Sequence, residues 1–453
     1  MRRATCLLAV LVALLAQGAS ARPAADCTQA QKTKAVAALA AFKQKVKGKR
    51  LTAAQRTRLA ALKRAVACTV QPDAATGYAA QLAAPGWVGD MSFPTTMPHL
   101  GQWTPINSQY HPSGTLRVLI VGVDYPDAAI GYAPQAYHDA HAARAEEWYR
   151  NASYGRLSLD VTVLDKTYRL SRPIADYGFP GGRDQRVAFL REVVGLADGD
   201  VDFSKVDVLL TAGPDHPAAR GIHVLGTYPG QGVTADGREL RYAIFSNGAF
   251  RDYGFPPKPL NDDQARVRAT HGAITHELGH VLGLQDVYYK TPEGRNTWEL
   301  VGGWDMMSDT TPGADFLAWH KYRLGWLEPR HLRGLEATGS LEETLVPIEI
   351  AGGRKAVVVP VSSTFLYVVE ARRKTGVDAT LCDEGVLVYT VDSTKSNAAG
   401  SIDVKAARDG DDPYCGPKAF AAFGAGETYE DGVVKVEVLS GAAAGYRVRV
   451  TRK

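Results

Sequence analysis

The chain has 453 residues, of which 45% are hydrophobic and 22% are charged, and its formal net charge is +4 at neutral pH. This composition excludes a wholly disordered chain, because disordered segments lack the apolar side chains that build a core. The length predicts two or three domains.

The first residues have the pattern of an export signal. Arg2 and Arg3 precede an apolar run over residues 7–16, and Ala19-Ser20-Ala21 has the small residues at which signal peptidase cleaves. The run is too short to cross a bilayer about 30 Å thick, and no second apolar stretch follows. We therefore predict a signal peptide over residues 1–21 and a secreted protein, extracellular or periplasmic, that does not span the membrane.

After cleavage, the chain retains an even number of cysteines: Cys27, Cys68, Cys382 and Cys415. In an exported protein this predicts two disulfides, with three pairings open. We favour Cys27 with Cys68 and Cys382 with Cys415, because each pair falls within one apparent structural unit. In the alternative, Cys27 or Cys68 is a removable zinc ligand that keeps a precursor inactive.

Residues 22–68 predict a helical hairpin. Apolar residues recur at three-to-four spacing around Phe42 and Leu62, Gly48 marks the turn between the helices, and residues 52–55 have the form of a capping box. Residues 28–67 contain eleven Lys and Arg and no Asp or Glu. The rest of the mature chain sums to about −9.

Three interpretations of this basic hairpin stay open. It can be a pro-segment that docks on its own acidic catalytic domain and is later removed, or a targeting module for an anionic surface such as a polymer, lipid or nucleic acid. It can also be a solvated helical pair whose lysines only maintain solubility. No motif indicates a specific nucleic acid. Residues 69–114, rich in Pro, Gly, Ala and Thr, predict a linker or an extended pro-region.

Strands and helices mix between residues 115 and 330, where we predict the catalytic domain. Runs rich in β-branched residues predict strands at 117–124, 157–163, 206–212 and 240–245. Helical spacing of apolar residues predicts helices near 135–150, 185–196, 264–282 and 314–324.

The helix predicted at 264–282 carries the most informative motif of the chain. His276 and His280 lie four residues apart, which places them on one helix face with Cβ atoms about 6 Å apart. A zinc ion with bonds of about 2.1 Å to nitrogen bridges such a gap. Gly283 can end the helix in the left-handed conformation, and Asp286 can then return as a third, carboxylate ligand. The fourth zinc position is left for water.

Glu277 follows the first histidine of this motif and points toward the fourth position. Zinc with three protein ligands lowers the pKa of a bound water toward neutrality. Glu277 would accept the proton of this water as it attacks a carbonyl carbon, and deliver it to the leaving nitrogen. A surface helix can match so short a pattern by chance, but the glycine and the aspartate in register argue against chance.

Further sequence blocks surround this motif in a specific order. They are VLIVGVDYPD (118–127), YRNASYGRL (149–157), WDMMS (304–308), LAWHKYRLGW (317–326), VEAR (369–372) and GVLVYTVD (385–392). Together with the zinc motif they resemble the immune inhibitor A family of secreted bacterial metallopeptidases, over roughly residues 115 to 450. The smaller snapalysin type shares the His-Glu and Asp pattern, but it explains less of this long chain.

The resemblance implies a metzincin-like zinc peptidase domain followed by a β-rich domain, with the motif residues in the roles given above. Met307, two residues after Asp305, matches the family's turn methionine, and bound calcium is a further expectation. Two positions depart from the family: Gln285 stands where a proline is usual, and no tyrosine closely follows the methionine turn. The second oxyanion donor therefore stays unassigned among the candidates Tyr288, Tyr289, His320 and Tyr322.

Beyond residue 331 the pattern changes to short Val-rich and Tyr-rich runs separated by turn residues. It predicts strands at 356–361, 366–370, 386–391, 433–439 and 446–450, which indicate an all-β, sandwich-like domain over residues 331–453. Asp409, Asp411 and Asp412, with Asp262 and Asp263, could bind calcium through oxygen. Their spacing matches no specific loop, so a plain turn is the simpler interpretation.

The sequence thus predicts an α+β protein whose function is the zinc-dependent hydrolysis of peptide bonds in protein or peptide substrates. Two alternatives stay open. One is a secreted binding or adhesin-like protein with a structural metal site, and the intact Glu277 argues against it. The other is a zinc amidase that does not act on proteins.

Overall fold

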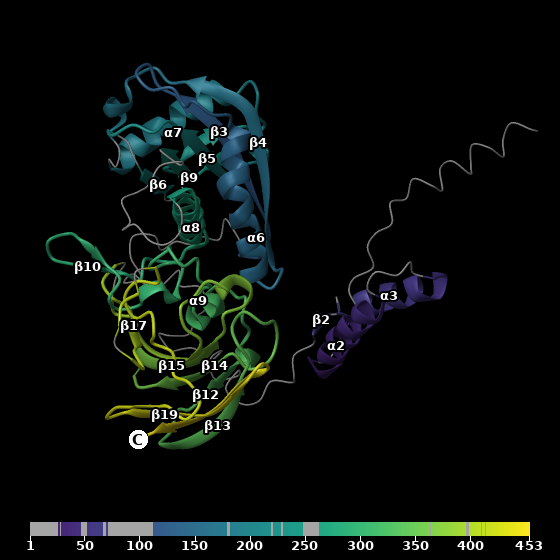
Figure 1. The fold of residues 1–453 in the computed structure, drawn as a ribbon. Helices are drawn as coiled ribbons and strands as arrows, with labels where there is room; N and C mark the ends of the chain where they lie inside the picture. The colour runs from purple at the N-terminus through teal and green to yellow at the C-terminus, as the bar shows by residue number, and fades with distance from the viewer. Residues whose placement is uncertain are drawn as a thin grey trace, which may run out of the picture. The chain divides into compact units, whose positions relative to one another are not determined.

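Helices and strands mix along the chain, which gives the α+β fold that the sequence predicts (Figure 1). The computed structural model describes residues 26–27, 29–46, 52–66, 69–70, 112–178, 182–218, 221–227, 230–247, 262–362, 364–395, 398–408, 410–412 and 414–453. The chain divides into two compact units, Met1–Asp73 and Ala74–Lys453. The predicted signal peptide lies outside the described residues, as does the predicted linker apart from residues 69–70 and 112–114.

The first unit consists of two helices, α2 (Gln29–Val46) and α3 (Ala53–Val66), with the short parallel strands β1 (Asp26–Cys27) and β2 (Thr69–Val70). The predicted capping box is confirmed, because Thr52 N donates to Gln55 Oε1 at 2.8 Å and Gln55 N donates to Thr52 Oγ1 at 3.2 Å. The predicted bridge between Cys27 and Cys68 lies outside the described residues. Basic side chains are exposed on both helices: Lys34, Lys43, Lys45, Arg56, Arg58 and Lys63.

The second unit begins with a five-stranded sheet in the order β4-β3-β5-β9-β6. Strands β3 (Gly114–Asp124), β4 (Leu157–Arg169), β5 (Val208–Gly213) and β9 (Tyr242–Asn247) are parallel, and β6 (Gly221–Gly226) is antiparallel at one edge. The four parallel strands were predicted, although β4 runs six residues past its predicted end. The edge strand β6 was not predicted.

Alternation along β3 decides which helix packs on which face of this sheet, because successive strand residues point to opposite sides. Leu116, Val118 and Ile120 belong to the apolar cluster that contains α6 (Ala143–Ala152) and α8 (Asp262–Leu282). Leu119, Val121 and Val123 belong to a second cluster with α7 (Arg183–Ala197). Helices α6 and α8 therefore cover one face and α7 covers the other.

The helix predicted at 135–150 is divided into three pieces. They are α5 (Pro134–Tyr137), a π-helical turn at His138–Ala142, and α6. Across the turn His138 Nε2 lies 2.8 Å from Glu146 Oε1. The helices predicted near 185–196, 264–282 and 314–324 are confirmed as α7, α8 and the shorter α9 (Ala318–Arg323).

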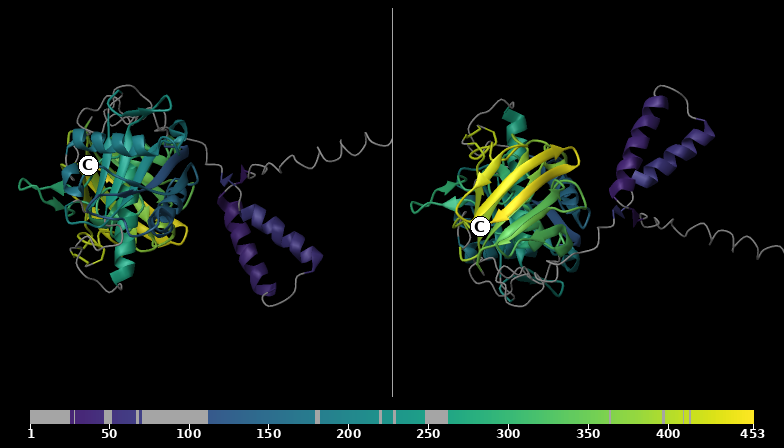
Figure 2. Two further views of the ribbon diagram at one scale, coloured as in Figure 1. Left: turned by 90° about the horizontal axis from the view of Figure 1, so that it is seen from above. Right: turned by 90° about the horizontal axis from the view of Figure 1, so that it is seen from below.

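Two antiparallel-rich sheets form the rest of this unit. One has the order β12-β14-β15-β16-β17 and the other β13-β20-β19-β18. Their inward valines share one apolar cluster, so the two sheets pack face to face (Figure 2). The strands are β12 (Leu332–Gly334), β13 (Gly339–Leu345), β14 (Ala356–Pro360), β15 (Phe365–Arg372), β16 (Gly385–Asp392), β17 (Ile402–Lys405), β18 (Thr428–Glu430), β19 (Val434–Ala442) and β20 (Gly445–Arg452).

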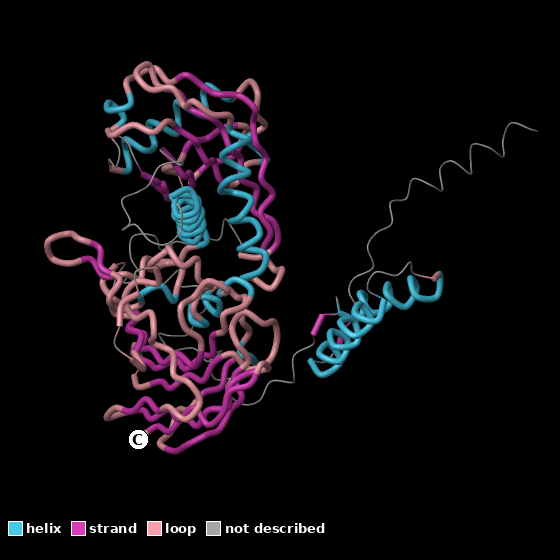
Figure 3. The backbone as a smooth tube through the Cα atoms, viewed as in Figure 1, coloured by secondary structure: helices cyan, strands magenta, loops and turns pink. Residues whose placement is uncertain are grey.

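A layer rich in loops lies between the first sheet and these two (Figure 3). It contains α9 and the small hairpin of β10 (Tyr289–Lys290) and β11 (Asn296–Thr297). One apolar cluster runs through the layer, from Leu116 on β3 to Ala422 near the end of the chain. The parts before and after residue 330 therefore share a core. In the described ranges, no helix is long and apolar enough to cross a bilayer.

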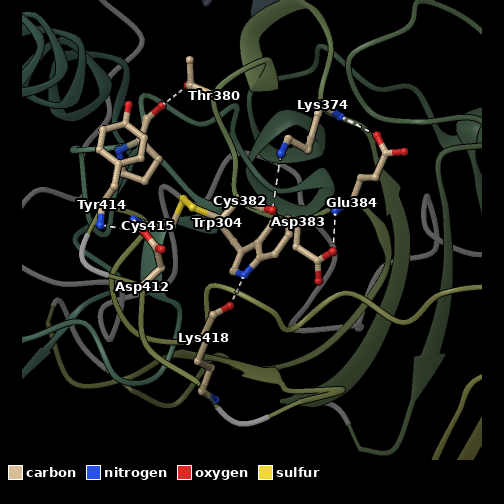
Figure 4. The surroundings of a disulfide bond; sticks show 11 residues. Trp304, Lys374, Thr380, Cys382, Asp383, Glu384, Asp412, Tyr414, Cys415 and Lys418 are labelled. Atoms are coloured by element: carbon tan, nitrogen blue, oxygen red, sulfur yellow. Dashed lines mark hydrogen bonds between the residues drawn. A yellow bond between two sulfur atoms is a disulfide. The ribbon is translucent and has the colours of Figure 1, made fainter. Parts of the chain in front are cut away.

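A disulfide joins Cys382 and Cys415, as predicted (Figure 4). A bond of this kind is consistent with an extracellular protein. The loop that contains Cys415 packs against the segment around Trp304, whose Nε1 donates to Lys418 O at 2.7 Å. In this loop Asp412 accepts from the backbone N–H of Cys415 at 2.9 Å. Of the other proposed calcium ligands, Asp409 and the side chains of Asp262 and Asp263 lie outside what the structure describes.

Gly302 lies just before the turn from Trp304 to Met307, which we call the methionine turn. We predict that a larger residue at this position destabilises the fold. Its φ is +60°, and a Cβ at this position would lie 2.0 Å from the backbone oxygen of Pro417. Gly302→Ala should therefore destabilise the fold by about 3 kcal/mol or more, measured by urea unfolding. Gly294→Ala is the matched control, because Gly294 also has a positive φ of +82° but its Cβ would meet nothing within 4 Å. Equal losses in the two variants would show that the close contact is unimportant.

Candidate metal centre

The end of α8 is built to turn the chain back on itself. Gly283 has a φ of +93°, a conformation that glycine adopts without a steric penalty. Gly283 N donates to His280 O and Leu284 N donates to Gly279 O, each at 2.9 Å. These two bonds are the Schellman pattern of a helix C-terminus. The chain therefore reverses within three residues of the helix end, and Asp286 returns toward the histidines.

His276, His280 and Asp286 meet at one point, as the sequence predicts. Their ligand atoms all lie within 4.8 Å of one another. Asp286 Oδ1 is 2.9 Å from His276 Nε2 and 3.2 Å from His280 Nε2. All three residues are at least 92% shielded from solvent, with exposed fractions of 8%, 5% and 8%.

Backbone carbonyl groups orient the two imidazole rings. His276 Nδ1 lies 2.8 Å from Met306 O, and His280 Nδ1 lies 2.9 Å from Leu284 O. Because a carbonyl only accepts, each Nδ1 must carry the proton, and in the neutral ring the lone pair that can bind a metal then lies on Nε2. Two such lone pairs and a carboxylate oxygen converge. This donor set fits a divalent cation that takes nitrogen and oxygen ligands.

The negative charge of Asp286 and the positive charge of a protonated His280 stabilise each other. Burial alone would raise the pKa of Asp286, but His280 and His276 hold that pKa well below its usual range. Burial would likewise lower the pKa of His280, but Asp286 raises it to about 9. A metal ion at this point would compete with the histidine protons, so binding would release protons.

Glu277 has a different environment from the three candidate ligands. The residue is partly exposed, so part of its side chain is accessible to water. Burial of its carboxylate nevertheless raises its pKa, and the opposing effects of His280 and His276 do not cancel this rise. A carboxylate with a raised pKa is a stronger base than an ordinary glutamate.

The methionine turn lies beneath α8. A Cβ on Gly279 would lie 2.5 Å from Met307 Sδ, so the methionine occupies space that any larger helix residue would need. Met307 O also accepts from Val287 N at 3.0 Å, which ties the residue after Asp286 to the turn. The turn thus contacts both α8, which carries the two histidines, and the segment that carries Asp286.

Asp305 holds this turn in shape. Its Oδ1 accepts from Met307 N at 2.7 Å, and its Oδ2 accepts from Leu317 N at 2.7 Å and from His320 Nδ1 at 2.8 Å. The side chain is fully buried. Asp305 and Met307 therefore have supporting positions, while His320 is engaged with Asp305.

The other oxyanion candidates are also placed. Burial raises the pKa of Tyr288, and the nearby carboxylate of Asp286 raises it further. Tyr289 pairs with Thr297 in the β10–β11 hairpin, and Tyr322 packs against the core. Tyr288 is thus the candidate whose electrostatic surroundings include Asp286.

Two contributors to the site were not found in the sequence. Arg186 on α7 donates to Val224 O on β6 at 2.7 Å, and its charge acts on Glu277. The Met306 carbonyl, which orients His276, is a backbone group. A basic residue of a helix and a carbonyl that any residue could supply leave no recognisable motif.

Cys382, Asp412 and Cys415 are also close enough together to hold a metal ion. Both sulfur atoms are joined in the disulfide, and a disulfide lacks the thiolates that bind metals. We therefore assign this cluster to the disulfide alone.

No protein-family model matches the chain, and no curated protein matches it. Among solved structures, two crystal structures of wild-type OgpA from Akkermansia muciniphila are similar at 13% sequence identity. The similarity covers 68% of this chain in both cases, and 96% and 95% of the OgpA chain, with TM-scores of 0.28 and 0.29.

Proposed function

We propose that this protein is a secreted zinc-dependent endopeptidase with a metzincin-like catalytic domain, of the immune inhibitor A type. The observation that carries the proposal is the orientation of the ligands. Two imidazole Nε2 atoms and a carboxylate oxygen converge within 4.8 Å, each imidazole fixed by a carbonyl, and Glu277 lies next to the first ligand. His276, His280 and Asp286 would hold the ion.

Bound zinc would supply a Lewis acid that lowers the pKa of water and stabilises negative charge on a substrate oxygen. The protein's own contribution is proton transfer by Glu277, which accepts the proton of the attacking water and passes it to the leaving nitrogen. The partly exposed position of Glu277, beside ligands that are buried, supports this role.

The edge strand β6 supports a polypeptide substrate over a small amide. Strand β6 pairs with β9 on one side, and in the described part of the chain no strand pairs with its other side. Arg186 connects this strand to the surroundings of Glu277. An extended peptide can add to such an edge through its backbone groups, which would lay a peptide bond across the site.

Hydrolysis of unfolded casein by the secreted protein tests the proposal. We expect cleavage that 1,10-phenanthroline reduces to background and that added zinc, but not added calcium, restores. Metal content is measured in parallel, together with a version that lacks residues 22–68, because a docked hairpin could block the site. Bound zinc without cleavage in both versions would contradict a peptidase and favour a binding role or a non-protein amide substrate.

A further inference from the structure

Arg372, at the end of β15, is an unusual residue for the interior of a protein. Its side chain is fully buried and lies among three buried carboxylates. Nε is 2.6 Å from Asp378 Oδ2 and 3.3 Å from Glu349 Oε1, and Nη1 is 3.3 Å from Glu370 Oε1. These partners hold the guanidinium plane in one orientation, because several donors are engaged at once.

The guanidinium also reaches the methionine turn. Arg372 Nη1 donates to Trp304 O at 2.9 Å, and Nη2 donates to Asp315 O at 3.3 Å. Its partner Glu370 accepts from Ala318 N at 2.7 Å. Strand β15 thus holds the segment from Trp304 to Ala318 at both ends, by charge-assisted bonds to backbone groups.

Trp304 is only two residues from the carbonyl that orients His276. The intervening Asp305 binds Met307 N at 2.7 Å, so the turn from Trp304 to Met307 is a single hydrogen-bonded piece. At the far side of this piece Met306 O lies 2.8 Å from His276 Nδ1. A displacement of the Trp304 carbonyl would move the Met306 carbonyl with it and rotate the imidazole.

We propose that Arg372 is a positioning residue for the metal centre, which acts on His276 through the methionine turn. This inference rests on the proposed function, because it assumes that His276 binds a metal. It makes the β-rich part of the chain a component of the active site, since the group that holds the turn comes from β15. Groups that orient the ligands typically change metal affinity by about 10- to 100-fold.

If Arg372 only stabilised the fold, replacing another equally buried side chain would affect the metal centre just as much. Lys355 provides that comparison. Lys355 is equally buried, and its Nζ donates to Pro347 O at 2.8 Å and to Ile350 O. No hydrogen bond of Lys355 in the described residues reaches the turn. Lys355→Met therefore perturbs a buried basic side chain in the same part of the core without loosening the Trp304 carbonyl.

The test compares Arg372→Lys with Lys355→Met in the full mature chain. Arg372→Lys keeps the charge but lacks the planar fork that binds Trp304 O and Asp378 together. Zinc affinity is measured by competition with a chelator, and the visible spectrum of the cobalt-substituted protein reports ligand geometry. We expect Arg372→Lys to bind zinc about 10- to 100-fold more weakly with a shifted cobalt spectrum, and Lys355→Met to match the wild type.

Wild-type affinity and an unchanged cobalt spectrum in Arg372→Lys would overturn the inference, as would an equal loss of affinity in Lys355→Met. If Arg372→Lys does not fold, the same measurements are made on Glu370→Gln. Its amide oxygen can still accept from Ala318 N, while its hold on the guanidinium weakens, so unchanged zinc affinity in this variant also overturns the inference. A wild-type protein that binds no zinc would instead refute the proposed function.

Discussion

Replacing Glu277 with glutamine should leave zinc binding intact and lower peptide hydrolysis by about 10²- to 10⁴-fold. Glutamine has nearly the same shape as glutamate but cannot accept a proton at neutral pH. The three side chains proposed to hold the metal do not include Glu277, so the loss should fall on the chemical step and not on the metal. The measurement is kcat on a quenched peptide, with zinc content determined on the same sample.

Glu293→Gln is the control for this variant. Glu293 is exposed in the β10–β11 hairpin, so the same chemical change there should leave kcat and zinc content at wild-type values. If Glu277→Gln retained hydrolysis within tenfold of the wild type, another group would have to be the base. Loss of zinc together with activity would instead show that Glu277 supports the ligands, and the role proposed for it would be wrong.

Asp286→Asn should weaken zinc binding by about 100-fold or more, at or above the upper end of the effects known for groups that only orient ligands. The amide has no charge, whereas the Asp286 carboxylate lies 2.9 and 3.2 Å from the two Nε2 atoms that share the site. Without this negative charge, the two histidine rings also lose the carboxylate that stabilises their close approach. Chelator competition gives the affinity, and elemental analysis gives the metal retained after dialysis.

Asp207→Asn provides a matched control, because Asp207 is another buried carboxylate, 5% exposed, that binds Arg117 at 2.8 Å away from the metal centre. It should lose stability and keep zinc. Unchanged zinc affinity in Asp286→Asn would mean that the third ligand is another residue. Equal losses in both variants would point to general unfolding as the cause.

The elements with a strong local pattern could be predicted from the sequence. The predicted strand at 386–391 corresponds to β16 (Gly385–Asp392), and the one at 446–450 corresponds to β20 (Gly445–Arg452). Both could be predicted because valines and tyrosines that face a core give a dense apolar pattern in the sequence. At the site, a helix with two histidines four residues apart and a glycine at its end specifies its geometry within one stretch of chain. The convergence of His276, His280 and Asp286 follows from that stretch alone.

The remaining features depend on partners that are distant in the sequence. Strand β6 is short, glycine-flanked and contains His223, and it becomes a strand by pairing with β9. The contact of Arg372 with Trp304 O spans 68 positions and ends on a backbone oxygen. A backbone acceptor has no residue identity, so no spacing rule could have identified this link between the β-rich part and the metal centre.

The shared apolar core has a consequence for how the protein is made. Synthesis proceeds from the N-terminus, so α6 and α8 emerge before β15 and β16, whose side chains cover the same cluster. Until the last third of the chain has been translated, a half-made molecule presents an apolar face to its surroundings, and such faces aggregate. The secretion proposed for this protein would avoid that exposure, because a chain that crosses a membrane unfolded folds only after the whole chain has crossed.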